Sequence, residues 1–232
     1  IVISASHNSF EYNGIKFFNG DGYKLDDLLE EKIEDLILSS VDVNSHITGD
    51  LIGKCLEAEE NARALYEQHL LETVDYRLDG KKIVLDCANG AAYLAAPRVY
   101  RELGAEVIVL SDEPNGVNIN ENCGSTHPER MAAKVRETGA DLGLAFDGDA
   151  DRLIVCDNLG RIVDGDKTIA ICARMLKREG RLAENKVTAT VMSNIGFHKA
   201  MEAAGIDVDV TGVGDRYVLE RMLETGCVLG GE

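Results

Sequence analysis

The fold of this 232-residue chain is decided by residues 82–111, which read KIVLDCANGAAYLAAPRVYRELGAEVIVLS. Two short apolar runs, 82–86 and 106–111, enclose a longer segment, 91–103, whose length suits a helix. An Asn-Gly turn precedes this segment and Gly104 ends it. Strand, helix and strand in this order predict a parallel βαβ unit.

The same kind of pattern continues toward the C-terminus. A helix is expected around 128–139, followed by a strand over 141–146 whose apolar run suits a strand buried on both faces. Residues 153–163 predict a hairpin that adds an antiparallel edge, and a helix over 166–178 completes the domain. We therefore expect a three-layer α/β/α fold with a mixed, mostly parallel sheet.

A weaker internal repeat follows at a separation of roughly 105 residues. Strand 187–192, helix 195–204 and strand 207–210 again come in the order strand, Asn turn, helix, Gly and strand. The order indicates a second copy of the same domain, and the alternative is a chance similarity between two α/β segments.

The N-terminal part predicts two helices, over 26–38 and about 57–73. Residues 76–80 then indicate a linker, so we place a domain boundary near residue 78. The division expected is 1–78, 79–182 and 183–232, with the first and third parts incomplete. Because the chain starts without an initiator Met, we expect a piece of a longer protein.

Composition narrows the functional classes. With 41 acidic against 24 basic residues, the formal net charge of −17 argues against a nucleic-acid or anionic-membrane surface. The six cysteines are dispersed without a CxxC pair, which favours reduced thiols and a cytoplasmic protein. No apolar run approaches the length of a membrane span.

The strongest chemical signal is DGDADR at residues 147–152, directly after the predicted buried strand. Three carboxylates at alternate positions, Asp147, Asp149 and Asp151, can converge on one hard divalent cation. The carboxyl ends of strands in open α/β sheets are also where ligands bind. The alternative is a solvated acidic turn.

Two other known types of acidic loop each differ from this motif at one or more defining positions. An EF-hand needs Gly at its sixth position and Glu at its twelfth, where this chain has Arg152 and Asn158. A haloacid-dehalogenase phosphatase would use Asp147 as nucleophile, but such enzymes usually have Thr or Val where this chain has Asp151. The third carboxylate indicates that a phosphoryl carrier lies elsewhere, and the phosphatase stays an alternative.

A candidate carrier lies near the start, in Ser4-Ala-Ser-His-Asn8 followed by Asn13-Gly-Ile-Lys16. A serine hydroxyl is a poor nucleophile until a base or a cation assists it. His7 and Lys16 can handle protons or phosphate charge. Taken alone, this stretch is equally compatible with an ordinary structural loop.

Together these motifs resemble those of the alpha-D-phosphohexomutase superfamily, namely its Thr/Ser-Ala-Ser-His-Asn-Pro loop and its Asp-Gly-Asp-x-Asp-Arg metal loop. Residues 212–217, GVGDRY, resemble the specificity loop of its third domain, and 230–232 the start of its Gly-Glu-x-Ser-Gly-His sugar loop. Residues 118–127, NINENCGSTH, resemble the branch that acts on glucosamine phosphates. We assign this last segment no catalytic contact. The resemblance covers essentially the whole chain.

The resemblance implies a role for each residue of the first two motifs. Ser6 would be the phosphorylated serine, Lys16 a general acid/base, and Arg152 a group that steadies phosphoryl charge. His7 would either take part in the chemistry or orient the loop. One Mg²⁺ would be held with a phosphoserine oxygen by Asp147, Asp149 and Asp151.

The resemblance also implies a sugar site formed by Gly214, Asp215, Arg216 and Glu232. Two positions depart from the family pattern: Ser9 stands where Pro is usual, and Gly212 where many relatives have Lys. The second departure puts one phosphate or proton contact in doubt.

The activity implied is exchange of a phosphoryl group between O6 and O1 of glucosamine phosphate, through a phosphoserine enzyme and a 1,6-bisphosphate. Mutases for mannose or glucose phosphates, a metal-dependent phosphatase and a non-catalytic binding module are the alternatives. The expected partner is a phosphosugar, with a homodimer as an open expectation. Because family segments upstream of the serine and at the far end are missing from the 232 residues, the resemblance implies that this piece alone turns over little or no substrate.

Overall fold

The computed structural model describes residues 1–39, 49, 52–54 and 61–232. The chain divides into two compact units. The first consists of Ile1–Ser4 with Asn13–Asp75, and the second of Ala5–Tyr12 with Tyr76–Glu232.

The first unit holds a small hairpin and two helices. Strand β1 (Val2–Ser4) pairs antiparallel with β2 (Gly14–Lys16). Helix α1 (Asp27–Leu38) and helix α2 (Ala62–Glu72) lie where the sequence predicts helices. The first four residues of the second predicted helix, 57–60, lie outside the described residues.

The second unit contains a five-stranded sheet with the order β4-β3-β5-β6-β7. Its first three strands are mutually parallel, and β6 and β7 are antiparallel, so the predicted mixed sheet with a hairpin edge is confirmed. The strands are β3 (Lys82–Asp86), β4 (Glu106–Leu110), β5 (Leu142–Phe146), β6 (Leu153–Asp157) and β7 (Ile162–Val163). Short 3-10 helices occur at Phe10–Tyr12 and Ala183–Asn185.

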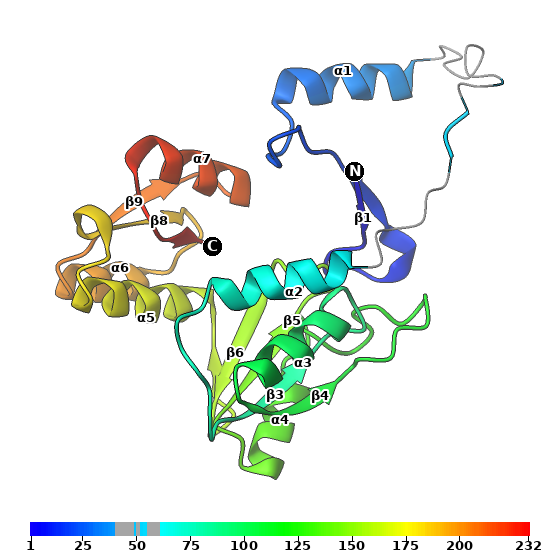
Figure 1. Cartoon of the computed structure of the whole chain (residues 1–232). Helices are drawn as coiled ribbons and strands as arrows, with labels where there is room; N and C mark the ends of the chain where they lie inside the picture. The colour runs from blue at the N-terminus through cyan, green and yellow to red at the C-terminus, as the bar shows by residue number, and fades with distance from the viewer. Residues whose placement is uncertain (40–48, 50–51, 55–60) are drawn as a thin grey trace. The chain divides into compact units, whose positions relative to one another are not determined.

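Helices cover both faces of this sheet (Figure 1). Val84 on β3 packs in a cluster with Met131 of α4 (Glu129–Thr138), whereas its neighbour Ile83 packs with Ala92 of α3 (Ala92–Glu102). Successive residues of a strand point to opposite faces, so α3 and α4 lie on opposite sides. The result is the predicted three-layer α/β/α arrangement.

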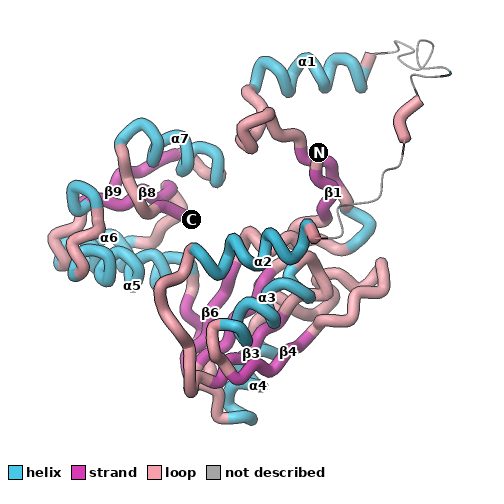
Figure 2. The backbone as a smooth tube through the Cα atoms, viewed as in Figure 1, coloured by secondary structure: helices cyan, strands magenta, loops and turns pink. Residues whose placement is uncertain are grey.

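A second, three-stranded parallel sheet follows, with the order β10-β8-β9. Along the chain, helices alternate with the strands of this sheet, as the cyan and magenta segments of Figure 2 show. A methyl group placed on Gly230 would meet Met222, and one on Gly231 would meet Ile169. Helices α7 and α5 therefore cover opposite faces. The elements are α5 (Gly165–Arg178), β8 (Lys186–Thr190), α6 (Ile195–Ala203), β9 (Asp207–Thr211), α7 (Asp215–Thr225) and β10 (Gly230–Gly231).

Helix α5 packs with this second sheet. Its buried residues Ile169 and Ala173 belong to the same cluster as Val187 and Met201. Lys177 donates from Nζ to the carbonyl oxygen of Ala204 at 2.8 Å, at the end of α6. The sequence places this helix correctly along the chain but attaches it to the preceding sheet, because periodicity shows that a face is buried and not which strands bury it.

The described cysteines are free thiols. Among the residues that the structure describes, none of the helices is both long enough and apolar enough to cross a bilayer.

Candidate metal centre and serine loop

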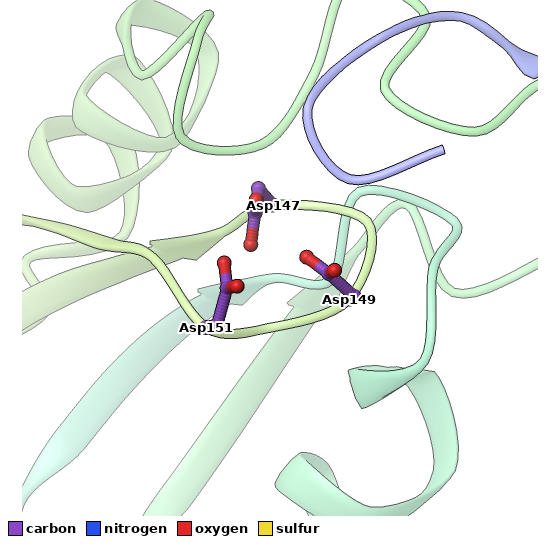
Figure 3. A group of neighbouring side chains, drawn as sticks. All are labelled: Asp147, Asp149 and Asp151. Carbon is purple, nitrogen blue, oxygen red and sulfur yellow. The ribbon is translucent and has the colours of Figure 1, made fainter. Parts of the chain in front are cut away.

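The Asp loop, residues 147–152, connects β5 to β6. Pairing of Phe146 with Leu153 closes the loop at its base, so its three carboxylates must share a small space. One ligand oxygen from each of Asp147, Asp149 and Asp151 lies within 4.8 Å of the others. Figure 3 shows the three side chains directed toward one another.

Asp147 is the buried member of this group. Its side chain is 0% exposed, and its Oδ1 accepts a hydrogen bond from the Arg152 backbone N–H at 3.2 Å. Its Oδ2 is buried and has no hydrogen-bond partner among the described residues. Burial, and then repulsion from Asp151 and Asp149, raises the pKa of Asp147 above its ordinary value.

These properties fit a divalent cation. An orphaned buried carboxylate oxygen is costly, and a cation bound by oxygen ligands removes both the missing contact and the repulsion. Hard, all-oxygen donor sets suit Mg²⁺, Ca²⁺ or Mn²⁺. The residues present can therefore hold the metal that the sequence predicts.

The serine loop, residues 5–12, lies against the Asp loop. The backbone N–H of Gly148 donates to the Ser6 carbonyl oxygen at 3.0 Å. A Cβ on Gly148 would lie 2.5 Å from that oxygen, so this close approach requires glycine. Ser6 itself has a left-handed backbone with φ of 51°, and its Oγ lies 3.4 Å from Nδ1 of His7.

The structure therefore places the loop that carries Ser6 and His7 against the Asp loop through a backbone contact at Ser6. Arg152 closes the Asp loop through its backbone, because its carbonyl oxygen accepts from the Asp147 N–H at 3.4 Å, and its side chain is exposed. Lys16 lies on β2, in the first unit.

Asn120 is a contact that the sequence analysis missed. Its Nδ2 donates to the carbonyl oxygens of both Ser6 and Asn8, each at 2.8 Å. It lies in segment 118–127, to which the sequence analysis assigned no catalytic contact. The contacts are to backbone atoms more than one hundred positions away, and no local pattern announces them.

The predicted sugar-site residues gather at the start of α7. Glu232 accepts a hydrogen bond on Oε1 from the Gly214 N–H at 2.7 Å. Gly214 has φ of 132°, which favours glycine, and Asp215 begins the helix. The guanidinium of Arg216 pairs with Glu220 at 2.8 Å.

Models of three phosphoglucomutase/phosphomannomutase domains match the chain in order. Alpha/beta/alpha domain I matches residues 1–42, domain II residues 64–160 and domain III residues 164–232. Together they take in most of the chain. The chain belongs to the phosphoglucomutase/phosphomannomutase family. The domain II match contains the Asp loop, and the domain III match contains Gly214 and Glu232.

Individual relatives of this family agree. The chain is 55% identical to a phosphoglucosamine mutase of Alkaliphilus metalliredigens over 232 residues, which is 100% of this chain and 52% of the relative. It is 52% identical to a phosphoglucosamine mutase of Acetivibrio thermocellus, again over the whole chain and 51% of the relative. The chain thus spans about half the length of the curated relatives it matches.

A solved structure supports the fold. A phosphoglucomutase/phosphomannomutase family protein from Burkholderia thailandensis superimposes with a TM-score of 0.79 at 25% identity, covering 100% of this chain and 48% of that protein.

Proposed function

We propose that the protein to which this chain belongs is a phosphoglucosamine mutase, which interconverts glucosamine 6-phosphate and glucosamine 1-phosphate. The observation that carries the proposal is the hydrogen bond from Gly148 to Ser6, because it ties a serine loop to three convergent carboxylates. The similarity to phosphoglucosamine mutases over the whole chain supports the choice of sugar.

In the proposed reaction, Ser6 carries the phosphoryl group on Oγ. The bond between phosphorus and Ser6 Oγ breaks as the bond to O1 of glucosamine 6-phosphate forms, which gives the 1,6-bisphosphate. The O1 proton passes to a base, for which Lys16 is the candidate, and that proton then neutralises the Ser6 oxygen that leaves phosphorus. After the bisphosphate turns over, Ser6 Oγ loses its proton to the base as it takes the phosphoryl group from O6, and O6 receives that proton.

The surroundings of Ser6 support its assignment as carrier. The left-handed backbone and the tether to Gly148 hold the residue beside the Asp loop, and positioning supplies much of the acceleration of phosphoryl transfer. His7 lies close enough to orient the Ser6 hydroxyl. The exposed guanidinium of Arg152 is suited to neutralise phosphate charge.

The metal proposed is one Mg²⁺, held by Asp147, Asp149 and Asp151. When bound, it would neutralise charge on the transferring phosphoryl group. The sugar site proposed consists of Gly214, Asp215, Arg216 and Glu232. The hydrogen bond between Gly214 and Glu232 supports a common role for these residues.

We also propose a domain boundary near residue 78, a cytoplasmic location, and assembly as a homodimer. Fractionation and light scattering on the full-length protein test the last two. The boundary expected at residue 182 is moved to the start of α5, because α5 packs with the second sheet and domain III matches residues 164–232.

The test of the carrier is Ser6→Ala in the full-length protein, with Ser4→Ala as a control within the same stretch. Incubation with a ³²P-labelled hexose bisphosphate should label the parent on Ser6, and peptide mapping locates the label. We expect the Ser6 variant to lose labelling and mutase turnover together, while the Ser4 variant keeps both. Label on Asp147 would instead indicate a phosphatase-like nucleophile, and full turnover without Ser6 would rule out the carrier.

A side-by-side assay tests the sugar. We expect glucosamine 6-phosphate to have the highest kcat/KM among glucosamine, glucose and mannose phosphates. A preference for glucose or mannose phosphate would place the protein in another branch of the family.

A further inference from the structure

The side chain of Asn120 joins two segments that are far apart in the sequence. Its Nδ2 donates to the carbonyl oxygens of Ser6 and Asn8, both at 2.8 Å. A primary amide carries two N–H donors in one plane, and both are used here. One side chain thus holds the backbone on both sides of His7.

The orientation of this amide follows from its partners. Two carbonyl oxygens can only accept, so the NH₂ group must face them and Oδ1 must point away. Asn120 is 7% exposed, and Oδ1 is buried without a partner among the residues described. The whole donor capacity of the side chain is therefore directed at the serine loop.

The backbone of Asn120 is anchored on the sheet side. Its φ is 57°, a left-handed conformation that Asn tolerates better than most residues. Its N–H donates to the carbonyl oxygen of Ala88, after β3, at 2.9 Å. This anchor allows the side chain to act as a fixed support.

The Asn120 side chain and the Asp loop share one hydrogen-bond acceptor in the serine loop. The Ser6 carbonyl oxygen accepts from both Gly148 N–H and Asn120 Nδ2, which uses both of its lone pairs. A Cβ on Gly148 would lie 2.9 Å from Asn120 Nδ2, so all three residues meet closely. The position of Ser6 relative to the three carboxylates is thus set by Asn120 as well as by Gly148.

We propose that Asn120 is a positioning residue for phosphoryl transfer. Its amide acts as a clamp: its two hydrogen bonds hold the serine loop so that Ser6 keeps its position against the Asp loop. This inference rests on the proposed mutase function. Asn120 touches only backbone carbonyls of the loop, so it acts through Ser6 and is not itself a catalytic residue.

Three variants of the full-length protein test the clamp. Asn120→Asp keeps the shape and tolerates the left-handed backbone, but it places acceptors against two carbonyl oxygens. Asn120→Gly removes the side chain and keeps the backbone conformation accessible. Asn122→Asp is the matched control, because Asn122 is also left-handed, with φ of 52°, and its side chain is exposed.

The first measurement does not depend on substrate. Hydrogen exchange of peptides covering residues 5–12 should be at least about 10-fold faster in both Asn120 variants than in the parent, since hydrogen bonds that hold the loop are lost. Exchange in strands β3 and β5 should stay within about 2-fold of the parent, and the Asn122 variant should match the parent throughout. Unchanged exchange in the serine loop would overturn the clamp.

The second measurement is the split between kcat and KM. Misplacement of the phosphoryl donor should lower kcat by about 100-fold in Asn120→Asp, with KM within about 3-fold of the parent. Parent-like kcat, or a rise in KM that accompanies general unfolding of the sheet, would show a structural role only and overturn the inference. If the parent protein had no mutase activity, the proposed function and the catalytic part of this inference would both be contradicted. The hydrogen-exchange data would still decide whether the clamp exists.

Discussion

Gly148 illustrates at the scale of one residue how closely the two loops meet. A Cβ at this position would lie 2.5 Å from the Ser6 carbonyl oxygen and 2.7 Å from Cδ1 of Ile119. The first neighbour cannot give way, because it is a backbone atom that already accepts a hydrogen bond from Gly148 N–H. The position therefore excludes every side chain.

We expect Gly148→Ala to destabilise the protein by about 1–3 kcal/mol, the usual range for inserting a group into a packed site. Urea unfolding measures the change. Gly20→Ala is the control, since nothing lies within 4 Å of a Cβ there. Equal stability of the two alanine variants would contradict the close contact.

Cys87 shows how burial determines the reactivity of a thiol. Burial, helped by the charges of Asp86 and Asp112, raises the pKa of Cys87 to about 12. At about pH 8 only roughly one thiol in ten thousand would be ionised, and the thiolate is the reactive form.

In a brief treatment of the native protein with iodoacetamide, we expect Cys172, which is partly exposed, to be modified long before Cys87. Peptide mass spectrometry measures both sites. In urea the two should react at similar rates, which serves as the control. Comparable labelling of both thiols in the native protein would mean that Cys87 is not buried as described.

At the scale of an element, helix α5 begins with a capped and charged first turn. The Oδ1 of Asp164 accepts from the Lys167 N–H at 3.0 Å, and its Oδ2 pairs with Lys167 Nζ at 2.7 Å. The hydrogen bond from the Lys167 side chain is the largest cause that lowers the pKa of Asp164 below its ordinary value. Because α5 packs in the core of the second sheet, the stability of its first turn contributes to the stability of that sheet.

We expect Asp164→Ala to lower the free energy of unfolding by about 1 kcal/mol at neutral pH, as for other lost N-caps. Asp164→Asn should lose less, because its side-chain oxygen can still accept from Lys167 N–H. A depressed pKa contributes stability above the ordinary pKa that disappears as pH falls through the folded value.

The stability difference between the parent and Asp164→Asn should therefore shrink as the pH is lowered below about 4. Urea titrations of both proteins across this range measure it, and titrations shared by both cancel in the difference. A gap that stays constant or widens in acid would contradict the role of the charge.

At the scale of the whole molecule, the Asp loop can couple folding to cation binding, because burial and repulsion from its neighbours raise the pKa of Asp147. Mg²⁺ that binds only the folded chain should stabilise it by about 2.7 kcal/mol at a hundred-fold excess over its Kd. We expect Mg²⁺ to raise the thermal midpoint at constant ionic strength, and EDTA to reverse the change.

Asp151→Asn should remove most of this increment while leaving the metal-free protein about as stable as the parent, because it relieves repulsion at Asp147. Asp207→Asn is the control for charge alone, since the exposed Asp207 lies on β9. If Asp207→Asn lost the Mg²⁺ effect as fully as Asp151→Asn, the effect would reflect the overall acidity of the chain.

Much of this molecule was predictable from its sequence because the signals are local. Strand β3 lies where the apolar run predicts it, and the hairpin of β6 and β7 follows its turn residues. Asp147, Asp149 and Asp151 share one loop, so their convergence needs only the short span between two strands that pair at Phe146 and Leu153.

Only the tertiary structure decided the contacts between distant segments. The attachment of α5 to the second sheet depends on which strands bury Ile169, and no periodicity specifies that. The contacts of Asn120 with Ser6 and Asn8 span 114 and 112 positions. They arise because Ala88, after β3, anchors Asn120 and Gly148, after β5, binds Ser6 at the carboxyl ends of two neighbouring strands. Such proximity is a property of the packed chain and not of any short stretch of it.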